Sequence, residues 1–306
     1  MKVWPNRIPL VVVADDYGIS NDRSRGIIHS MLYGIVTNTS IMANMCTAEH
    51  ALDMLRSNGL LERVWLHLNL SEGIPLSAPS DIPSLLIASG PGSPRFLGKT
   101  GFQKACRAGK IRVEHVRIEA RAQLQWFIRN VGHPPIHVDS HQHVHVLPAL
   151  VDTLAKLFVD MGVTFVRTPT TTARATDRRP PCPVCSIVSS HAATARKRFR
   201  VYGLCCLDAF VGLSFCGTIY TVAQIVDAVD TQIAVGAYSV EMMTHPGFPE
   251  LTKPTALDHT SVCTGDCDSF NTSDNRFTEL KTLCEPGVAC RLDPIVRLTH
   301  FAELMS

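Results

Sequence analysis

Short apolar runs alternate with longer stretches of helical period along this chain, and the alternation predicts a strand followed by a helix several times over. The first apolar run, residues 10–14, contains three consecutive valines, which favours a buried strand. A helix is expected from Ser20 to Tyr33, with Ser20 as its N-cap and Gly34 at its end. The other expected elements are strands at 35–42, 64–70, 135–140, 163–168 and 238–243, helices at 46–55, 114–131, 148–161 and 221–229, and a last helix and strand within 275–301.

Repeated βα units predict an α/β fold of mostly parallel strands with outer helices, either open or closed into a barrel. In both forms, functional groups gather at the carboxyl ends of the strands. Residues 71–101, rich in proline, serine and glycine, are expected to form a loop. The pattern also weakens after residue 169, and we expect an insertion or loop over 170–200.

Composition narrows the classes of partner. With 29 basic and 27 acidic residues the net charge is +2, which disfavours nucleic acid and anionic membranes as partners. The apolar run near the start is far shorter than the ~20 residues of a membrane span, and too short for a signal peptide. We therefore expect a cytoplasmic protein, although the sequence does not separate cytosol from nucleus. The 11 cysteines are an odd number and are expected to be reduced thiols.

Two cysteine pairs and one glycine-rich stretch resemble known motifs without matching them. Cys182 with Cys185, and Cys263 with Cys267, have different spacings, so a structural zinc site is disfavoured. The Gly-Lys-Thr at 98–100 lacks both the glycine spacing of a phosphate-binding loop and a preceding strand. Nucleotide binding is not expected there.

Acidic and histidine side chains follow the predicted strands. Asp15 and Asp16 end the first strand, where they could bind a cation or simply cap the next helix. His67 ends a later strand, where a lone histidine is more often a hydrogen-bonded core residue. Residues 137–145 read HVDSHQHVH, and in an extended strand His137, Asp139, His141, His143 and His145 would share one face.

His245 ends the strand at 238–243, before a Pro-Gly turn. With Asp15, Asp16, His67 and the 137–145 stretch, it completes a set of metal-competent groups at strand ends. Imidazole and carboxylate together suit zinc and other divalent ions. The residues therefore indicate a metal site with an acid/base partner.

Five stretches, in this order, resemble the YdjC-like carbohydrate deacetylases, which include bacterial chitooligosaccharide deacetylase. They are ADDYG at 14–18, GIVTNTS at 34–40, LH at 66–67, HVDSHQHVH at 137–145 and MTHP at 243–246. The resemblance covers nearly the whole chain and implies one domain over 1–306 with a distorted TIM-like (β/α) barrel. It also implies removal of acetyl groups from N-acetylated oligosaccharides with a bound divalent metal.

By position, the resemblance assigns Asp16, His67 and His141 to the metal, Asp15 as general base and His245 as general acid. It suggests magnesium, whereas two histidines and one carboxylate suit zinc by ligand preference. Amide hydrolysis needs an activated water, a polarised carbonyl and a proton for the leaving amine, and this set can supply all three.

Neighbouring residues receive less specific roles. Asp139 is expected to orient a histidine, and Arg167 to bind Asp15 or a sugar hydroxyl. His143 and His145 are expected to support the metal ligands or to touch the sugar.

Two other functions stay open: a metal-dependent hydrolase of another amide or a phosphate ester, and a non-catalytic sugar- or metal-binding protein. Few basic residues flank the motifs, which disfavours the phosphate ester. A pure binding protein would not need Asp15 beside a metal ligand. The sequence leaves the natural sugar and a homo-oligomer undetermined.

Overall fold

Parallel strands form the centre of the fold in the computed structural model, which describes residues 7–87, 94–170, 183–249, 270 and 273–305. Along the sheet the strands follow the order β5-β4-β3-β2-β1-β7-β6, and β8 pairs with the start of β1. Every pairing between these strands is parallel. The strands are β1 (Ile8–Tyr17), β2 (Asn38–Ile41), β3 (Val64–Leu68), β4 (His137–Ser140), β5 (Phe165–Val166), β6 (Ala209–Val211), β7 (Val240–Thr244) and β8 (Val296–Leu298).

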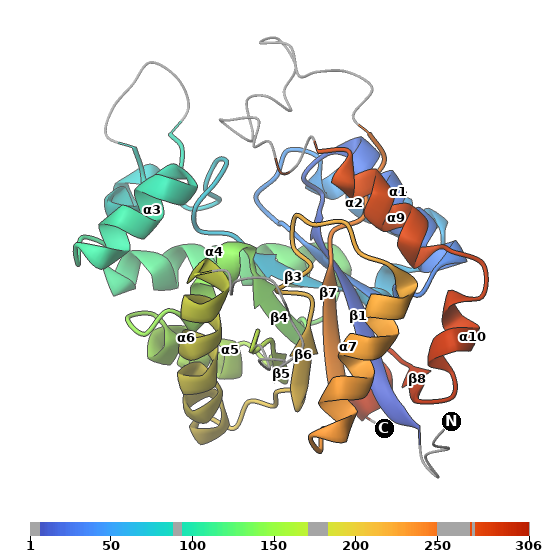
Figure 1. Cartoon of the computed structure of the whole chain (residues 1–306). Coiled ribbons are helices and arrows are strands. Elements are labelled where there is room, and N and C mark those ends of the chain that lie inside the picture. The colour runs from blue at the N-terminus through green and yellow to red at the C-terminus, as the bar shows by residue number, and fades with distance from the viewer. Residues whose placement is uncertain (1–6, 88–93, 171–182, 250–269, 271–272, 306) are drawn as a thin grey trace.

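Helices surround this sheet, as Figure 1 shows. The α-helices are α1 (Asn21–Tyr33), α2 (Ala48–Ser57), α3 (Gly98–Arg107), α4 (Val113–Val131), α5 (Val151–Asp160), α6 (Pro183–Val201), α7 (Val222–Ala234), α9 (Asn275–Leu283) and α10 (Val288–Leu292). The 3-10 helices are η1 (Leu61–Arg63), η2 (Pro79–Asp81), η3 (Pro83–Leu85), η4 (His141–Val146) and η5 (Phe301–Met305).

The two ends of the sheet approach each other. The Val166 amide of β5 donates to the Cys205 carbonyl at 2.9 Å, and the Cys205 amide donates to the Thr164 carbonyl at 2.8 Å. Cys205 lies just before β6, the strand at the other end of the sheet. This contact curls the sheet into a distorted (β/α) barrel, and the predicted fold class is confirmed.

Strand β1 lies inside the sheet and explains the continuous apolar run that predicted it. Residues 10–14 are fully buried, because helices cover a parallel sheet on its outer face and side chains fill its interior. Helix α1 begins and ends as predicted. The Ser20 side chain accepts a hydrogen bond from the Arg23 amide, and the Gly34 amide donates to the Ser30 carbonyl.

Two helices lie where the sequence predicted loops. Helix α6 occupies much of 170–200 and buries Ala192, Ala195 and Phe199. Helix α3 begins at Gly98 and buries only Phe102. In both helices the apolar stripe is too narrow or too small in side-chain volume to stand out from the polar residues around it.

The glycine-rich stretch and the cysteine pairs lie only partly within the described residues. Gly98 begins α3, while Gly92, the glycine from which the spacing of a phosphate-binding loop was counted, lies outside the described residues. Cys182, Cys263 and Cys267 also lie outside them. No disulfide joins any of the cysteines that the structure describes. Over the same residues, no helix has the length and apolar character needed to cross a bilayer.

Gly26 of α1 packs directly against the backbone that follows β7. A Cβ at Gly26 would lie 2.5 Å from the Phe248 amide nitrogen and 2.6 Å from the Gly247 Cα. Alanine normally stabilises a helix interior by ~0.5–1 kcal/mol relative to glycine. Because this contact is with backbone, we expect Gly26→Ala to destabilise the protein by about 1–3 kcal/mol instead. Urea unfolding measures the difference.

Gly101→Ala in α3 is the matched control. Among the residues that the structure describes, its Cβ would meet only the Leu97 side chain, at 3.2 Å, so we expect unchanged or slightly raised stability. If Gly26→Ala proved as stable as the control, the close packing of α1 on residues 247–248 would be wrong.

Candidate metal centre

Asp15 and Asp16 lie buried near the end of β1 and serve different groups. Asp16 has a φ of 63°, rare for a residue other than glycine, and the pairing of β1 with β2 shifts register there. This irregularity turns the two carboxylates to separate partners. The helix-capping alternative for this pair is wrong, because Ser20 caps α1.

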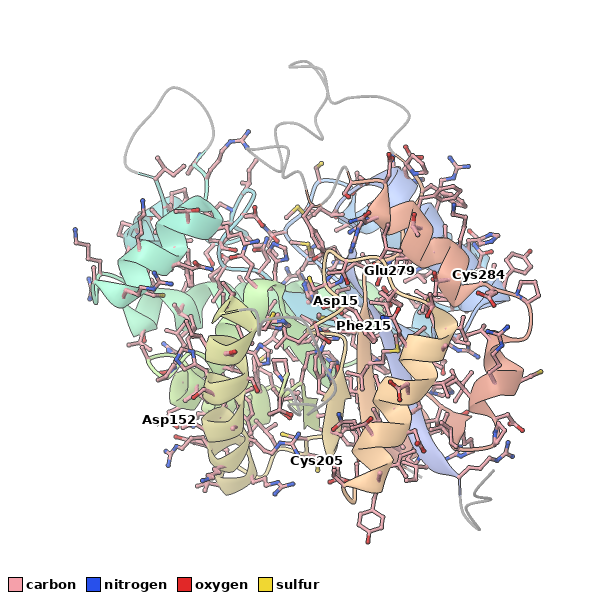
Figure 2. The ribbon with its side chains drawn as sticks, in the orientation of Figure 1. Asp15, Asp152, Cys205, Phe215, Glu279 and Cys284 are labelled. Carbon is pink, nitrogen blue, oxygen red and sulfur yellow. The ribbon has the colours of Figure 1, made fainter. Side chains whose placement is uncertain are left out.

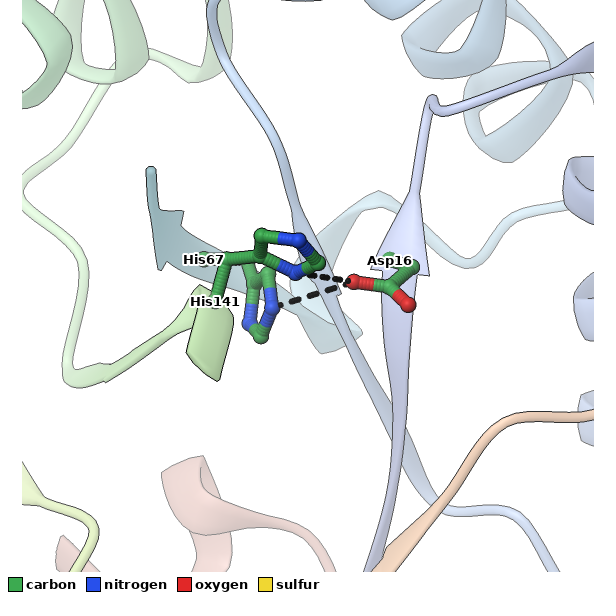
Figure 3. Close-up of side chains that lie close together, drawn as sticks. All are labelled: Asp16, His67 and His141. Atoms are coloured by element: carbon green, nitrogen blue, oxygen red, sulfur yellow. Dashed lines mark hydrogen bonds and ion pairs between the residues drawn. The ribbon is translucent and has the colours of Figure 1, made fainter. Parts of the chain in front are cut away.

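Asp16, His67 and His141 converge from three strand ends. His67 Nε2 lies 3.2 Å and His141 Nδ1 lies 3.0 Å from the same Asp16 oxygen, Oδ1 (Figure 3). One ligand atom from each residue lies within 4.8 Å of the other two. Ligands about 2.1 Å from one ion are separated by roughly 3.0–3.4 Å in octahedral or tetrahedral geometry. The three groups could therefore hold one divalent ion.

His67 reaches the cluster because of the register between β3 and β4. His67 lies beside Asp139 in the parallel pairing, and its Nδ1 donates to Asp139 Oδ1 at 2.6 Å. The hydroxyl of Ser40, on β2, lies 3.2 Å from the same nitrogen. Because Asp139 and Ser40 both contact Nδ1, the other ring nitrogen of His67, Nε2, faces Asp16. Asp139 was expected to orient a histidine, and the structure places it against His67.

The prediction that His137, Asp139, His141, His143 and His145 share one face of a strand is wrong beyond Ser140. Strand β4 ends there, and Gln142 and His143 both take a φ of 56°. Period-2 alternation holds only in extended backbone, so the turn breaks the alternation that would have aligned His143 and His145 with His141. His145 is buried between the Ser140 hydroxyl and the Arg167 carbonyl, which its Nε2 contacts at 2.8 Å. Because the His145 side chain is fully buried, it is not positioned to contact a sugar.

Arg167, just after β5, joins three carboxylates in the barrel interior. It contacts Asp15 Oδ1 at 2.8 Å, Asp139 Oδ2 at 2.7 Å and Glu241 Oε1 at 2.6 Å. Figure 2 shows Asp15 near the centre of the molecule, with Asp152 and Cys205 toward its margins. Two further clusters of metal-competent groups include these carboxylates. The Arg167 guanidinium already neutralises part of the negative charge in those two clusters. Of the three clusters, the one formed by Asp16, His67 and His141 is therefore the best candidate for a bound cation.

Burial and charge set the protonation of these groups. Burial raises the pKa of Asp15 to about 6 against the opposing effect of Arg167. Burial alone would lower the histidine pKa values, but Asp139 raises that of His67 to about 10, and Asp16 raises that of His141 to about 9. Without a metal, the carboxylates therefore hold protonated imidazoles, and a cation binding there would have to displace those protons.

His245 follows β7 and faces Asp15 across the site. Its Nε2 lies 4.0 Å from Asp15 Oδ2, and its amide donates to Glu279 Oε1 at 3.0 Å. Arg23 and Arg276 both donate to its carbonyl oxygen, at 3.3 and 3.4 Å. Burial and these two cations keep the pKa of His245 well below its usual value. Hydrogen bonds to the amide and the carbonyl of His245 thus fix its backbone, and with it the position from which the ring extends.

Sequence reasoning missed three acidic residues of this region. Glu241 had a signal, since it is the one charged residue in the apolar strand β7. Glu279 lies on α9, and Glu72, which contacts His141 Nε2, follows β3 in a segment expected to be loop. No local pattern distinguished these two from surface acids.

The fold and the cluster define a (β/α)-barrel protein that could hold a divalent metal at the carboxyl ends of its strands. The chain belongs to the family of YdjC-like proteins, whose family model matches residues 9–293.

Named relatives are similar over most of this chain. The carbohydrate deacetylase of Mus musculus is 36% identical over 288 residues, covering 92% of this chain and 89% of the relative. That of Homo sapiens is 35% identical over 298 residues, covering 94% and 87%. The chitooligosaccharide deacetylase of Serratia marcescens is 30% identical over 243 residues, covering 79% and 83%.

A solved structure shares the fold. A protein from Enterococcus faecalis described as a cellobiose-phosphate cleavage protein superposes with a TM-score of 0.73. The match covers 98% of this chain and 99% of the other at 19% identity. At that identity the likeness supports the architecture alone.

Proposed function

We propose that this protein is a metal-dependent hydrolase that removes acetyl groups from N-acetylated carbohydrates resembling chitooligosaccharides. One observation carries the proposal: a three-donor cluster able to hold an ion lies beside an acid/base pair, Asp15 and His245, that contributes no donor to it. The named deacetylases among the relatives support the bond and the substrate class.

In this proposal Asp16, His67 and His141 hold the metal. When bound there, the ion supplies a polarised acetyl carbonyl and a more acidic water. Asp15 accepts the proton of the attacking water, and its raised pKa lets the carboxyl keep that proton for transfer. Arg167 fixes the Asp15 carboxylate through two hydrogen bonds, which limits its rotation.

His245 delivers a proton to the leaving nitrogen. Its lowered pKa keeps the imidazole neutral until a proton arrives, and makes the imidazolium a strong acid once formed. The 4.0 Å between His245 Nε2 and Asp15 Oδ2 exceeds a direct hydrogen bond. A substrate group or a water between them would connect the two.

We propose magnesium as the ion, on the family resemblance, with zinc as the alternative that the donor set favours. We further propose one domain over 1–306, a cytoplasmic location, and a chain able to form a homo-oligomer. Size-exclusion chromatography with light scattering tests the last of these.

The other candidate functions find less support in the site. A phosphate ester would call for cationic side chains turned toward the ion. Arg167 is committed to three carboxylates. Arg23 lies 3.9 Å from Asp16 Oδ2, but it donates to the His245 carbonyl and balances the charge of a metal ligand. In a non-catalytic sugar-binding protein Asp15 would still balance the charge of Arg167, but the approach of His245 to Asp15 would have no role.

Acetate release from N,N'-diacetylchitobiose tests the proposal. We expect release that stops when a chelator removes the metal and returns when Mg²⁺ or Zn²⁺ is restored, because the ion is needed to polarise the acetyl carbonyl. An enzymatic acetate assay on protein of measured metal content follows the reaction. Metal-loaded protein that binds chitobiose without releasing acetate would favour the binding-protein alternative.

A further inference from the structure

The two histidines of the cluster each contact a second carboxylate through the ring nitrogen that faces away from Asp16. His67 presents Nε2 to Asp16 and donates from Nδ1 to Asp139. His141 is reversed: it presents Nδ1 to Asp16, and its Nε2 contacts Glu72 Oε2. An imidazole can offer a lone pair to a metal from one nitrogen only if the proton sits on the other. Each carboxylate therefore favours the ring form that the cluster requires.

The backbone around Glu72 is held by amide side chains. Asn69 Oδ1 accepts from the amides of Ser71 and Glu72 at 3.1 and 3.2 Å. The Glu72 carbonyl accepts from Asn69 Nδ2 at 2.7 Å and from Asn44 Nδ2 at 3.0 Å. Four hydrogen bonds thus fix the backbone of a short segment that belongs to no helix or strand. They also fix the position of the Glu72 Cα, from which the side chain extends.

The Glu72 carboxylate is also directed by Gln142. Gln142 Nε2 donates to Glu72 Oε2 at 3.1 Å, and Gln142 follows His141 in the turn where φ is 56°. This unusual backbone places the Gln142 amide and the His141 ring on the same carboxylate oxygen. The Glu72 side chain remains 15% exposed, unlike the fully buried Asp139. Its replacement should disturb the fold less.

We propose that Glu72 is the positioning residue for His141: its carboxylate accepts a hydrogen bond from the Nε2–H, so that the proton stays on Nε2 and the Nδ1 lone pair faces the metal. The inference rests on the metal site of the proposed function and extends it to a residue that does not itself bind the ion. Carboxylates in this relation to a histidine ligand typically change metal affinity by about 10–100-fold when removed.

The experiment compares full-length wild type, Glu72→Ala, Glu72→Gln and Glu114→Gln by two measurements. Calorimetric titration with Zn²⁺ gives the metal affinity. Long-range ¹H–¹⁵N spectra of the zinc-loaded protein, with His141 assigned by His141→Gln, show which ring nitrogen carries the proton. Glu114 pairs with Arg117 on the surface of α4 and controls for loss of a carboxylate.

We expect Glu72→Ala to weaken zinc binding by roughly 10–100-fold and to mix the two ring forms of His141. Glu72→Gln, which keeps an oxygen acceptor, should recover most of the affinity and the Nε2-protonated form. Glu114→Gln should match wild type, and thermal melts identify any variant that fails to fold.

Two results would overturn the inference. Unchanged zinc affinity and ring form in Glu72→Ala would remove the positioning role. A Glu72→Gln variant as damaged as Glu72→Ala would mean that an oxygen acceptor at residue 72 does not suffice, and positioning through the hydrogen bond would be wrong. Acetate release by the wild type is measured separately. A protein that binds zinc but releases no acetate would refute the proposed function, while the Glu72 comparison of zinc affinity and ring form would still hold.

Discussion

Asp15→Asn is expected to lower acetate release by about 10²–10⁴-fold while leaving the metal in place. The amide cannot take a proton from water, but it keeps the shape of the side chain and can still contact Arg167. Asp15 is absent from the Asp16, His67 and His141 cluster, so metal affinity should change little. Steady-state acetate assays on N,N'-diacetylchitobiose, with metal content measured on the same samples, give both quantities.

Asp16→Asn is the matched variant one residue away. It removes the carboxylate oxygen shared by His67 and His141, so we expect metal and activity to be lost together. Adding excess metal should restore activity in part to Asp16→Asn and not at all to Asp15→Asn. An Asp15→Asn enzyme as active as wild type would refute Asp15 as the base.

Arg167→Gln is expected to destabilise the protein by about 3–5 kcal/mol, because removing one partner of a buried ion pair strands the other charges. Here three carboxylates, those of Asp15, Asp139 and Glu241, would lose their common cation. Equilibrium urea unfolding near pH 7 measures the loss. A variant within 1 kcal/mol of wild type would contradict this account.

The pH dependence has a definite sign. Against burial, Arg167 lowers the pKa of both Asp139 and Glu241 in the wild type. That stabilisation is present above the unfolded pKa values, near 4, and is lost as pH falls through the folded values. In Arg167→Gln the largest effect that opposes burial is lost, and only His67 and His137 still lower these pKa values. Both pKa values should therefore rise, and protonation should favour folding more than in the wild type. We therefore expect the stability difference to narrow as pH falls below about 5. Arg198→Gln, from a surface pair with Asp152, should show no comparable loss.

Local pattern carried much of the fold. The valine run predicted β1, and Ser20 and Gly34 marked the ends of α1, because strand burial and helix capping depend on residues close in sequence. Helices α3 and α6 escaped prediction because their apolar faces are small or interrupted. Their helical form depends on packing against the rest of the protein, which a sequence window does not contain.

The candidate site divides in the same way. The sequence by itself determined that Asp15, Asp16, His67, His141 and His245 lie at or just after the ends of strands, and parallel strands bring their carboxyl ends to one edge. Only the tertiary structure decided which groups meet there. The turn after Ser140 broke the alternation expected for His141, His143 and His145, and the curl of the sheet brought Arg167 to Asp15. Glu72, Glu241 and Glu279 joined because side-chain pairing depends on register and closure between distant segments, which no local pattern records.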